Sequence, residues 1–333
     1  MNQSSDAASH SPQPTSLALA TYRDLRIGVV VTMVMLATSI VFERLLATRW
    51  QAALSEYYYT SAHSIFIAAL LGLATLAFVY KGSSDTEDAL LTMAGIAALI
   101  AALVPQGRPE LYGSLDLPPE YDVESVVQPN VRTVVVALVL GWLLTLWQRR
   151  HNRGQQTRSP GGTLALYLLR MMVVLGLIAL FFRRDLFNQY AHGVAGAVML
   201  LAFIATVCCA AYVVGQEEES PRRNRYRRFY RMIAAVMLAT LIAVITLHIA
   251  RPGWLGNDLW IIVLESALIL EFAAYWVVQT IELWNTADRR ERLPECAQRR
   301  LAEGRTKGGL AGMKSELAEA MKDPPGQRLL PLL

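Results

Sequence analysis

Long runs of apolar residues without charge constrain this chain more than any other feature of its sequence. Eight such runs approach the ~20 residues that an α-helix needs to cross a bilayer, and together they take up about half of the 333 residues. Only 17% of the residues are charged, against roughly 25% in an average soluble chain. Helices satisfy their own backbone hydrogen bonds inside lipid. The sequence therefore predicts an all-α, polytopic transmembrane helix bundle.

The boundaries of the apolar runs divide the chain into three parts. We expect a disordered cytoplasmic leader at 1–22, a transmembrane helical domain at 23–284 and a basic cytoplasmic tail at 285–333. Ser84 followed three residues later by Glu87 is a capping-box pattern, which marks the start of a helix. The predicted spans are 25–45, 61–80, 88–105, 131–148, 163–182, 188–214, 231–250 and 259–282.

The distribution of Lys and Arg predicts the orientation of these eight spans. If the N-terminus is inside, 23 of the 31 basic residues fall in inside segments and seven in outside segments. Cytoplasmic loops carry the excess of positive charge, so we expect both termini inside. This use of the basic residues makes a nucleic-acid partner unnecessary. The tail's basic residues favour contact with anionic lipid headgroups.

Three histidines are expected at one level near the outer ends of separate spans. They are His63, His192 and His248, and Glu265 is expected slightly deeper on the same side. Three imidazoles and a carboxylate form a plausible ligand set for zinc or another divalent ion. Two other interpretations stay open: a shared polar pocket without metal, and histidines that each sit at the headgroup boundary. Four spans would have to converge for a metal site.

A run of tyrosines precedes His63 at the expected outer surface. Tyr57, Tyr58 and Tyr59 are typical of the interfacial belt, where the ring lies in lipid and the hydroxyl in water. Three successive residues of a helix cannot all face lipid. We therefore also consider that some of them, with Ser61, line an outer pocket.

Two charges are expected deep in the membrane, Arg170 in the fifth span and Glu271 in the eighth. Counted from the span ends at 1.5 Å per residue, both lie roughly 10–12 Å above the inner surface. Matching depth and opposite charge predict an intramembrane ion pair. A gate or a proton step is the alternative role.

Several segments resemble a family of uncharacterised multi-pass bacterial integral membrane proteins. The resemblance implies the bacterial inner membrane and assigns no activity. The segments are Ser55-Glu-Tyr-Tyr-Tyr-Thr60, His63 to Phe66, Tyr80-Lys81-Gly82, Asp88, Ala94-Gly95, Ala191-His192 and Glu265 to Trp276.

A fainter likeness is to the alkaline-ceramidase-like membrane hydrolases. That likeness implies a zinc site with Ser61 or Ser64 beside His63, His192 and His248. The His-x-x-x-His pair of those enzymes is absent here, and their helix count is seven rather than eight.

Common soluble catalytic motifs are missing, including Walker A, His-Glu-x-x-His and Gly-x-Ser-x-Gly. The first functional hypothesis is therefore a membrane protein that binds or passes a small solute, an ion or a lipid headgroup through a polar pocket at the outer face. The alternative is a metal-dependent lipid hydrolase that uses the histidine cluster. A structural or assembly role is a third class. The sequence leaves the oligomeric state and the question of enzyme activity open.

Overall fold

The computed structural model describes residues 14–46, 50–106, 123–151, 159–217, 220–254, 259–286 and 289–293. The regular structure of these residues is helical, which confirms the predicted all-α class. Two short 3-10 helices, η1 (Leu54–Tyr59) and η4 (Arg289–Arg292), accompany the α-helices. The α-helices are α1 (Pro14–Leu46), α2 (His63–Val79), α3 (Asp85–Leu103), α4 (Val123–His151), α5 (Pro160–Phe182), α6 (Arg184–Val214), α7 (Pro221–Ala250) and α8 (Trp260–Glu282).

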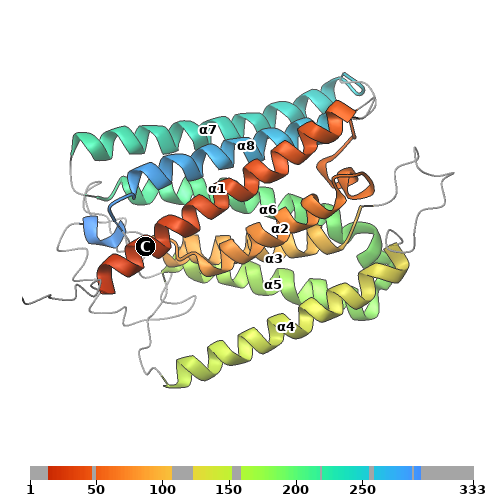
Figure 1. Ribbon diagram of the computed structural model, residues 1–333, viewed down its shortest axis with the longest axis horizontal. Coiled ribbons are helices and arrows are strands. Elements are labelled where there is room, and N and C mark those ends of the chain that lie inside the picture. The colour runs from red at the N-terminus through yellow and green to blue at the C-terminus, as the bar shows by residue number, and fades with distance from the viewer. Residues whose placement is uncertain are drawn as a thin grey trace, which may run out of the picture.

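Six of the helices pack into a closed ring. Around the ring they follow the order α1, α2, α3, α6, α7 and α8, and α8 packs back against α1 (Figure 1). α6 also contacts α8 across the ring. α5 packs on the outside of α3 and α6, and α4 lies at the edge of the molecule. This order brings α8 next to helices that are far from it in sequence.

Six helices begin earlier than the predicted spans, and three of them, α1, α4 and α7, begin at least eight residues earlier. α1 begins at Pro14, so residues 14–22 of the expected leader are helical, and residues 1–13 lie outside the described part. α4 begins at Val123 and α7 at Pro221, where the Ser220 hydroxyl accepts a hydrogen bond from the Arg223 amide at 3.0 Å. Hydropathy marks only the apolar part of a helix, whereas backbone hydrogen bonds extend the helix into water. Most of the predicted tail, 294–333, also lies outside the described residues.

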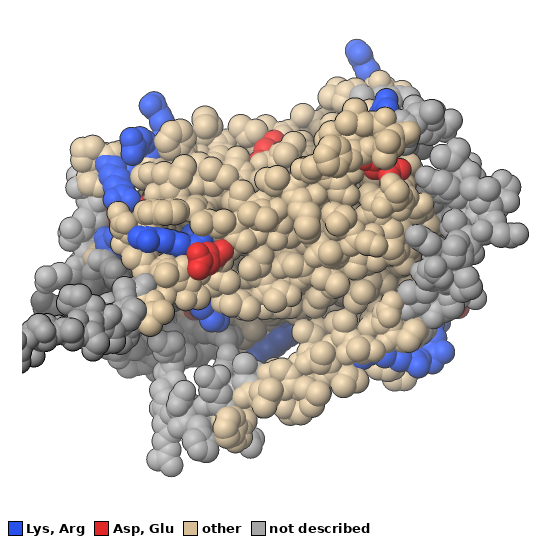
Figure 2. All heavy atoms as spheres, in the orientation of Figure 1, with Lys and Arg blue, Asp and Glu red and all other residues tan. Residues whose placement is uncertain are grey.

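The described helices are those of a multi-pass membrane protein. Six are long and apolar enough to cross a bilayer: Leu17–Leu46 of α1, and α3, α5, α6, α7 and α8. α2 and the segment Pro129–Leu144 of α4 are apolar but shorter. On the face shown in Figure 2, charged side chains gather mainly toward the two ends of the long axis, with a largely uncharged band between them. That distribution fits a bilayer around the band.

Candidate functional site along helix α8

The face of α8 that points into the bundle carries polar residues at its two ends and apolar residues between them. We call the Glu265 end the outer end and the Glu282 end the inner end, after the orientation that the Lys and Arg distribution predicts. The residues of this face are spaced by three and four positions, which places them on one side of a helix. All of them except Glu265 are at most 1% exposed. In order they are Glu265, Leu268, Phe272, Tyr275, Gln279 and Glu282.

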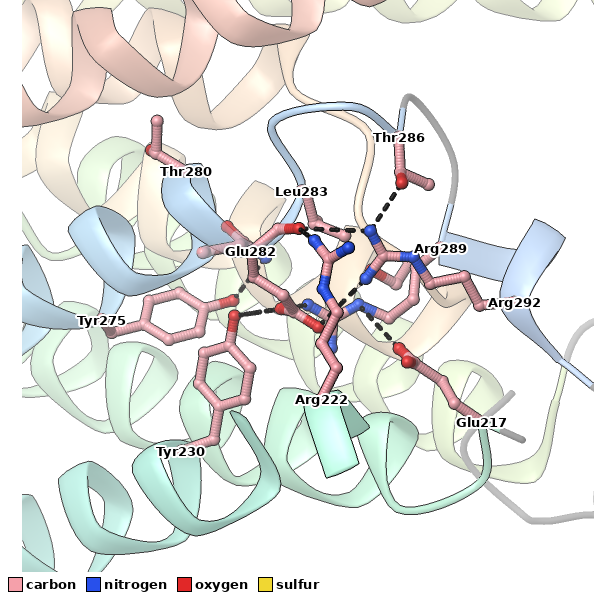
Figure 3. A network of polar contacts seen from close by, with 12 residues as sticks. Glu217, Arg222, Tyr230, Tyr275, Thr280, Glu282, Leu283, Thr286, Arg289 and Arg292 are labelled. Atoms are coloured by element: carbon pink, nitrogen blue, oxygen red, sulfur yellow. Dashed lines mark hydrogen bonds and ion pairs between the residues drawn. The ribbon is translucent and has the colours of Figure 1, made fainter. Parts of the chain in front are cut away.

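The inner end of this face is closed by a buried ion pair. Glu282 Oε2 lies 2.5 Å from Arg289 Nη2, and the Tyr230 hydroxyl donates to the same oxygen at 2.5 Å (Figure 3). The Nη1 of Arg292 lies 3.4 Å from the other carboxylate oxygen. These contacts fasten η4 and the end of α8 to α7.

A second carboxylate, Glu217, faces Arg289 from the loop after α6. Its Oε1 lies 3.8 Å from Arg289 Nε. Burial raises the pKa of the Glu217 carboxyl to about 7, and Arg289 opposes that rise. Burial lowers the pKa of Arg289, but Glu282, Tyr230 and Glu217 raise it further, so the net pKa lies well above its usual value. Arg289 therefore stays charged, while Glu217 exchanges a proton near neutral pH.

Glu87 at the start of α3 is a fully buried carboxylate held by hydrogen bonds. The Ser84 hydroxyl accepts from the Glu87 amide at 3.1 Å, as the capping-box pattern predicts, but the Glu87 side chain accepts from the amide of Ser83 at 2.8 Å. The other Glu87 oxygen accepts from the Tyr275 hydroxyl at 3.2 Å and from Gln279 at 3.5 Å. Glu87 is 0% exposed. None of the Lys and Arg side chains in the described ranges forms an ion pair with it.

A second buried arginine holds the inner end of α1 to the turn after α8. Arg26 is 1% exposed. Its Nη1 donates to the Leu283 carbonyl at 2.9 Å, and its Nε donates to the Tyr80 hydroxyl at 3.3 Å. The inner end of the bundle is thus built around two buried arginines, Arg26 bonded to neutral groups and Arg289 paired with acidic ones.

Aromatic and aliphatic side chains separate this inner cluster from Glu265. The Phe272 ring stacks on Phe203 of α6, with ring centroids 3.8 Å apart and planes inclined by 12°. Leu268, one turn nearer to Glu265, is 0% exposed. Close apolar packing of this kind separates the two polar ends.

The outer end of α8 is covered by η1. Glu265 Oε2 accepts a hydrogen bond from the Leu54 amide at 2.8 Å. The three tyrosines of η1, Tyr57, Tyr58 and Tyr59, are buried rather than directed into lipid. Tyr59 donates to the Gln106 carbonyl at 2.7 Å, and the Ser61 hydroxyl donates to Glu43.

Each of the three outer histidines has its own neighbour. His63 Nδ1 lies 2.5 Å from the Tyr58 carbonyl, and His192 Nδ1 lies 2.6 Å from the Val104 carbonyl. The His248 ring stacks on Trp260, with centroids 4.1 Å apart. In the part of the chain that the structure describes, no group of three or more His, Cys, Asp or Glu side chains is placed to hold a metal ion. No three of the predicted zinc ligands therefore meet, and zinc binding stays a prediction.

The expected ion pair between Arg170 and Glu271 does not form. Arg170 is exposed on α5, which packs on α3 and α6. Glu271 accepts a hydrogen bond from the Thr240 hydroxyl of α7 at 2.6 Å. Equal depth in the membrane was not enough to predict this pair, because two residues at one level can lie on different sides of a bundle.

Sequence reasoning missed the inner cluster of Glu87, Tyr275, Gln279, Glu282 and Arg289. One signal was available, since the polar positions of α8 follow the spacing of its inward apolar residues. Arg289 carries no such signal, because the turn after α8 decides where it lies.

The chain was compared with protein-family models, curated proteins and solved structures. No family model, curated protein or solved structure matches the chain.

Proposed function

We propose that this protein is an eight-span protein of the bacterial inner membrane, with both termini in the cytoplasm, that passes a small cation, in the simplest case a proton. The pathway follows the inward face of α8 between Glu265 at the outer end and Glu87 at the inner end. The bacterial assignment is supported by the family resemblance of the sequence, and the orientation by its Lys and Arg distribution.

The observation that carries the proposal is the environment of Glu87. Its carboxyl group is buried at the start of a membrane helix and accepts hydrogen bonds from neutral donors, namely Ser83, Tyr275 and Gln279. Arg289 acts on Glu87 electrostatically but forms no ion pair with it. An ionised carboxylate without a directly paired counter-ion is costly there. Such a group is either protonated or balanced by a cation that binds and dissociates. Ionisable groups of this kind commonly mark ion or proton pathways.

Glu265 is the matching group at the other end. Its one hydrogen-bond partner among the described residues is the Leu54 amide. Ten residues of α8 separate it from Tyr275, a rise of ~15 Å. Leu268 and the stacked pair of Phe203 and Phe272 occupy this interval. A polar group on each side of an apolar seal suits controlled passage, because an open water channel would leak.

The test is proton flux into liposomes that contain the purified protein and a trapped pH-sensitive dye. A potassium gradient with valinomycin sets an interior-negative potential. We expect the interior to acidify faster than in protein-free liposomes. Glu87→Gln and Glu265→Gln keep the shape of the side chain but cannot exchange a proton, so each should lower the flux at least tenfold. Asp24→Asn, at an exposed position of α1, is the matched control.

Phe272→Ala tests the seal. Removing the ring that stacks on Phe203 should raise the flux, provided that gel filtration shows a folded protein. Absence of flux in the unmodified protein under either sign of potential, with H⁺, Na⁺ and K⁺ each tried, would refute the proposal. Metal analysis of the same preparation separates the zinc hydrolase, which requires bound zinc, from a cation pathway, which does not.

A further inference from the structure

A basic pocket lies in the first turns of α7, on the side of this helix that faces away from the bundle. Its volume is about 580 Å³. The residues that line it are spaced by three and four positions, so they share one face of the helix. They are Asn224, Arg227, Arg228, Arg231 and Met232. Figure 1 places the first turns of α7 and the last turns of α8 at the same end of the bundle.

Among the described residues, no acidic side chain pairs with the three arginines of this pocket, Arg227, Arg228 and Arg231. The Nε of Arg227 is buried and has no hydrogen-bond partner. Neighbouring arginines differ, because Arg222 donates to the Glu282 carbonyl and Arg225 lies over the Tyr226 ring. An unbalanced cluster of guanidinium groups is a site for an anion.

The fold leaves space for Arg227 beside the end of α6. A Cβ atom at Gly215, the last residue before the loop after α6, would lie 3.2 Å from Arg227 Nε. The absence of a side chain at Gly215 therefore lets the guanidinium pack against the backbone of α6. Arg228 and Arg231 are exposed on the same face. One partly buried and two exposed arginines can converge on a phosphate group.

The pocket lies where the basic segment of α7 meets an exposed apolar surface. The opposite side of α7, with Tyr230, Ile233 and Met237, is buried in the bundle. On the side that faces away from the bundle, the positions four and eight residues after Arg228 are Met232, 54% exposed, and Val236, 46% exposed. Apolar side chains that face outward on a membrane helix contact lipid tails. A ligand with a phosphate and an acyl chain therefore matches the surface better than a free phosphate.

We propose that this pocket binds the headgroup phosphate of an anionic phospholipid, with an acyl chain along Met232 and Val236. The planar guanidinium groups donate paired hydrogen bonds to the phosphate oxygens. Such a site goes beyond the proposed cation pathway, because neither Glu87 nor Glu265 contributes to it.

The experiment measures lipid binding to the full-length protein in a neutral detergent by native mass spectrometry. The probes are phosphatidylglycerol and phosphatidylcholine with identical acyl chains, and soluble glycerol phosphate. We expect the protein to bind phosphatidylglycerol at least tenfold more tightly than phosphatidylcholine. Arg227→Gln, Arg228→Gln and Arg231→Gln should each weaken phosphatidylglycerol binding about tenfold, the effect of one lost charged hydrogen bond.

The matched control is Arg225→Gln, which removes the same charge from the same end of α7 but outside the pocket. It should change the affinity less than threefold. Arg228 and Arg231 are exposed, so their variants should fold even if Arg227→Gln does not. An equal loss of affinity in Arg225→Gln and in Arg228→Gln would mean diffuse attraction to a basic surface and would overturn the proposal. Equal affinities for the two lipids, or for glycerol phosphate and phosphatidylglycerol, would overturn it as well.

Discussion

Arg289 and Glu282 form an ion pair whose two side chains are each 1% exposed, with 2.5 Å between Nη2 and Oε2. The pair joins η4 to α8, only seven residues earlier in the chain. Tyr230 of α7 donates to the same carboxylate oxygen. Removing either charge leaves the other buried with only a longer contact, to Glu217 at 3.8 Å for Arg289 or to Arg292 at 3.4 Å for Glu282. That loss costs more than the pair itself contributes. The segment after α8 is therefore part of the packed structure at the inner end of the bundle.

Breaking this pair should destabilise the protein strongly. We expect Arg289→Leu or Glu282→Leu to lower the free energy of unfolding by about 3–5 kcal/mol, because each removes the shortest contact of a buried charge. The double substitution should recover a large part of that loss. Thermal unfolding in detergent measures both effects.

Arg292→Ala is the control for this prediction. Arg292 also contacts Glu282, at 3.4 Å, but its side chain is 20% exposed. Its removal should cost at most about 1 kcal/mol, as for ion pairs near the surface. Equal losses in Arg292→Ala and Arg289→Leu would show that burial of Arg289 is unimportant.

Glu217 should make stability depend on pH near neutrality. Its carboxyl pKa rises from 4.5 to about 7 on folding, so the folded state binds the proton more tightly than the unfolded state. Stability should therefore fall as pH rises from about 4.5 to about 7, by on the order of 1–2 kcal/mol, and then level off. The charges that face Glu217 are Arg289, Glu282, Arg292 and Arg222.

Glu217→Gln isolates this contribution, because glutamine has the same shape and does not titrate. Unfolding temperatures of the variant, measured between pH 5 and 8, should depend less steeply on pH than those of the unmodified protein. Identical pH profiles would mean that Glu217 does not titrate in this range.

Gly162 should not tolerate a side chain. Asp85 of α3 accepts hydrogen bonds from the Ser159 amide and hydroxyl at the start of α5. A Cβ at Gly162 would lie 2.5 Å from the Asp85 carboxyl carbon. Gly162→Ala should therefore lower stability by about 1–3 kcal/mol. Gly176→Ala, in the same helix with nothing within 4 Å of the added carbon, should be neutral or stabilising by up to ~1 kcal/mol. Equal unfolding temperatures for the two variants would contradict this prediction.

Reporter fusions test the orientation of the chain. The excess of Lys and Arg in alternate loops predicts that fusions after residues 155 and 225 and at the C-terminus report the cytoplasm. A fusion near residue 118, in a segment with five acidic residues, should report the opposite side. A C-terminus outside the cell would reduce the number of spans from eight to an odd number.

Only part of the candidate site could be predicted from the sequence. Glu265 was identified because an acidic residue inside an apolar run is conspicuous. Glu87 was predicted as part of a helix cap, and the structure places it there. The capping pattern does not show that Tyr275 and Gln279 of α8 donate to the Glu87 side chain. Arg170 and Glu271 were paired by depth, and depth along the membrane normal carries no information about position around the bundle.

The sequence by itself determined that this chain folds as a bundle of membrane helices, because uncharged runs of that length are stable only where their apolar side chains leave water. It also placed several helix boundaries, since caps and prolines act through neighbouring backbone atoms. Only the tertiary structure decided which helices meet: α1, α2, α3, α6, α7 and α8 share a ring that leaves α4 and α5 outside. Partners in such a ring are chosen by side-chain packing between segments far apart in the chain. The encounter of Arg289 with Glu217 and Tyr230, and of Glu87 with Tyr275, follows from that packing.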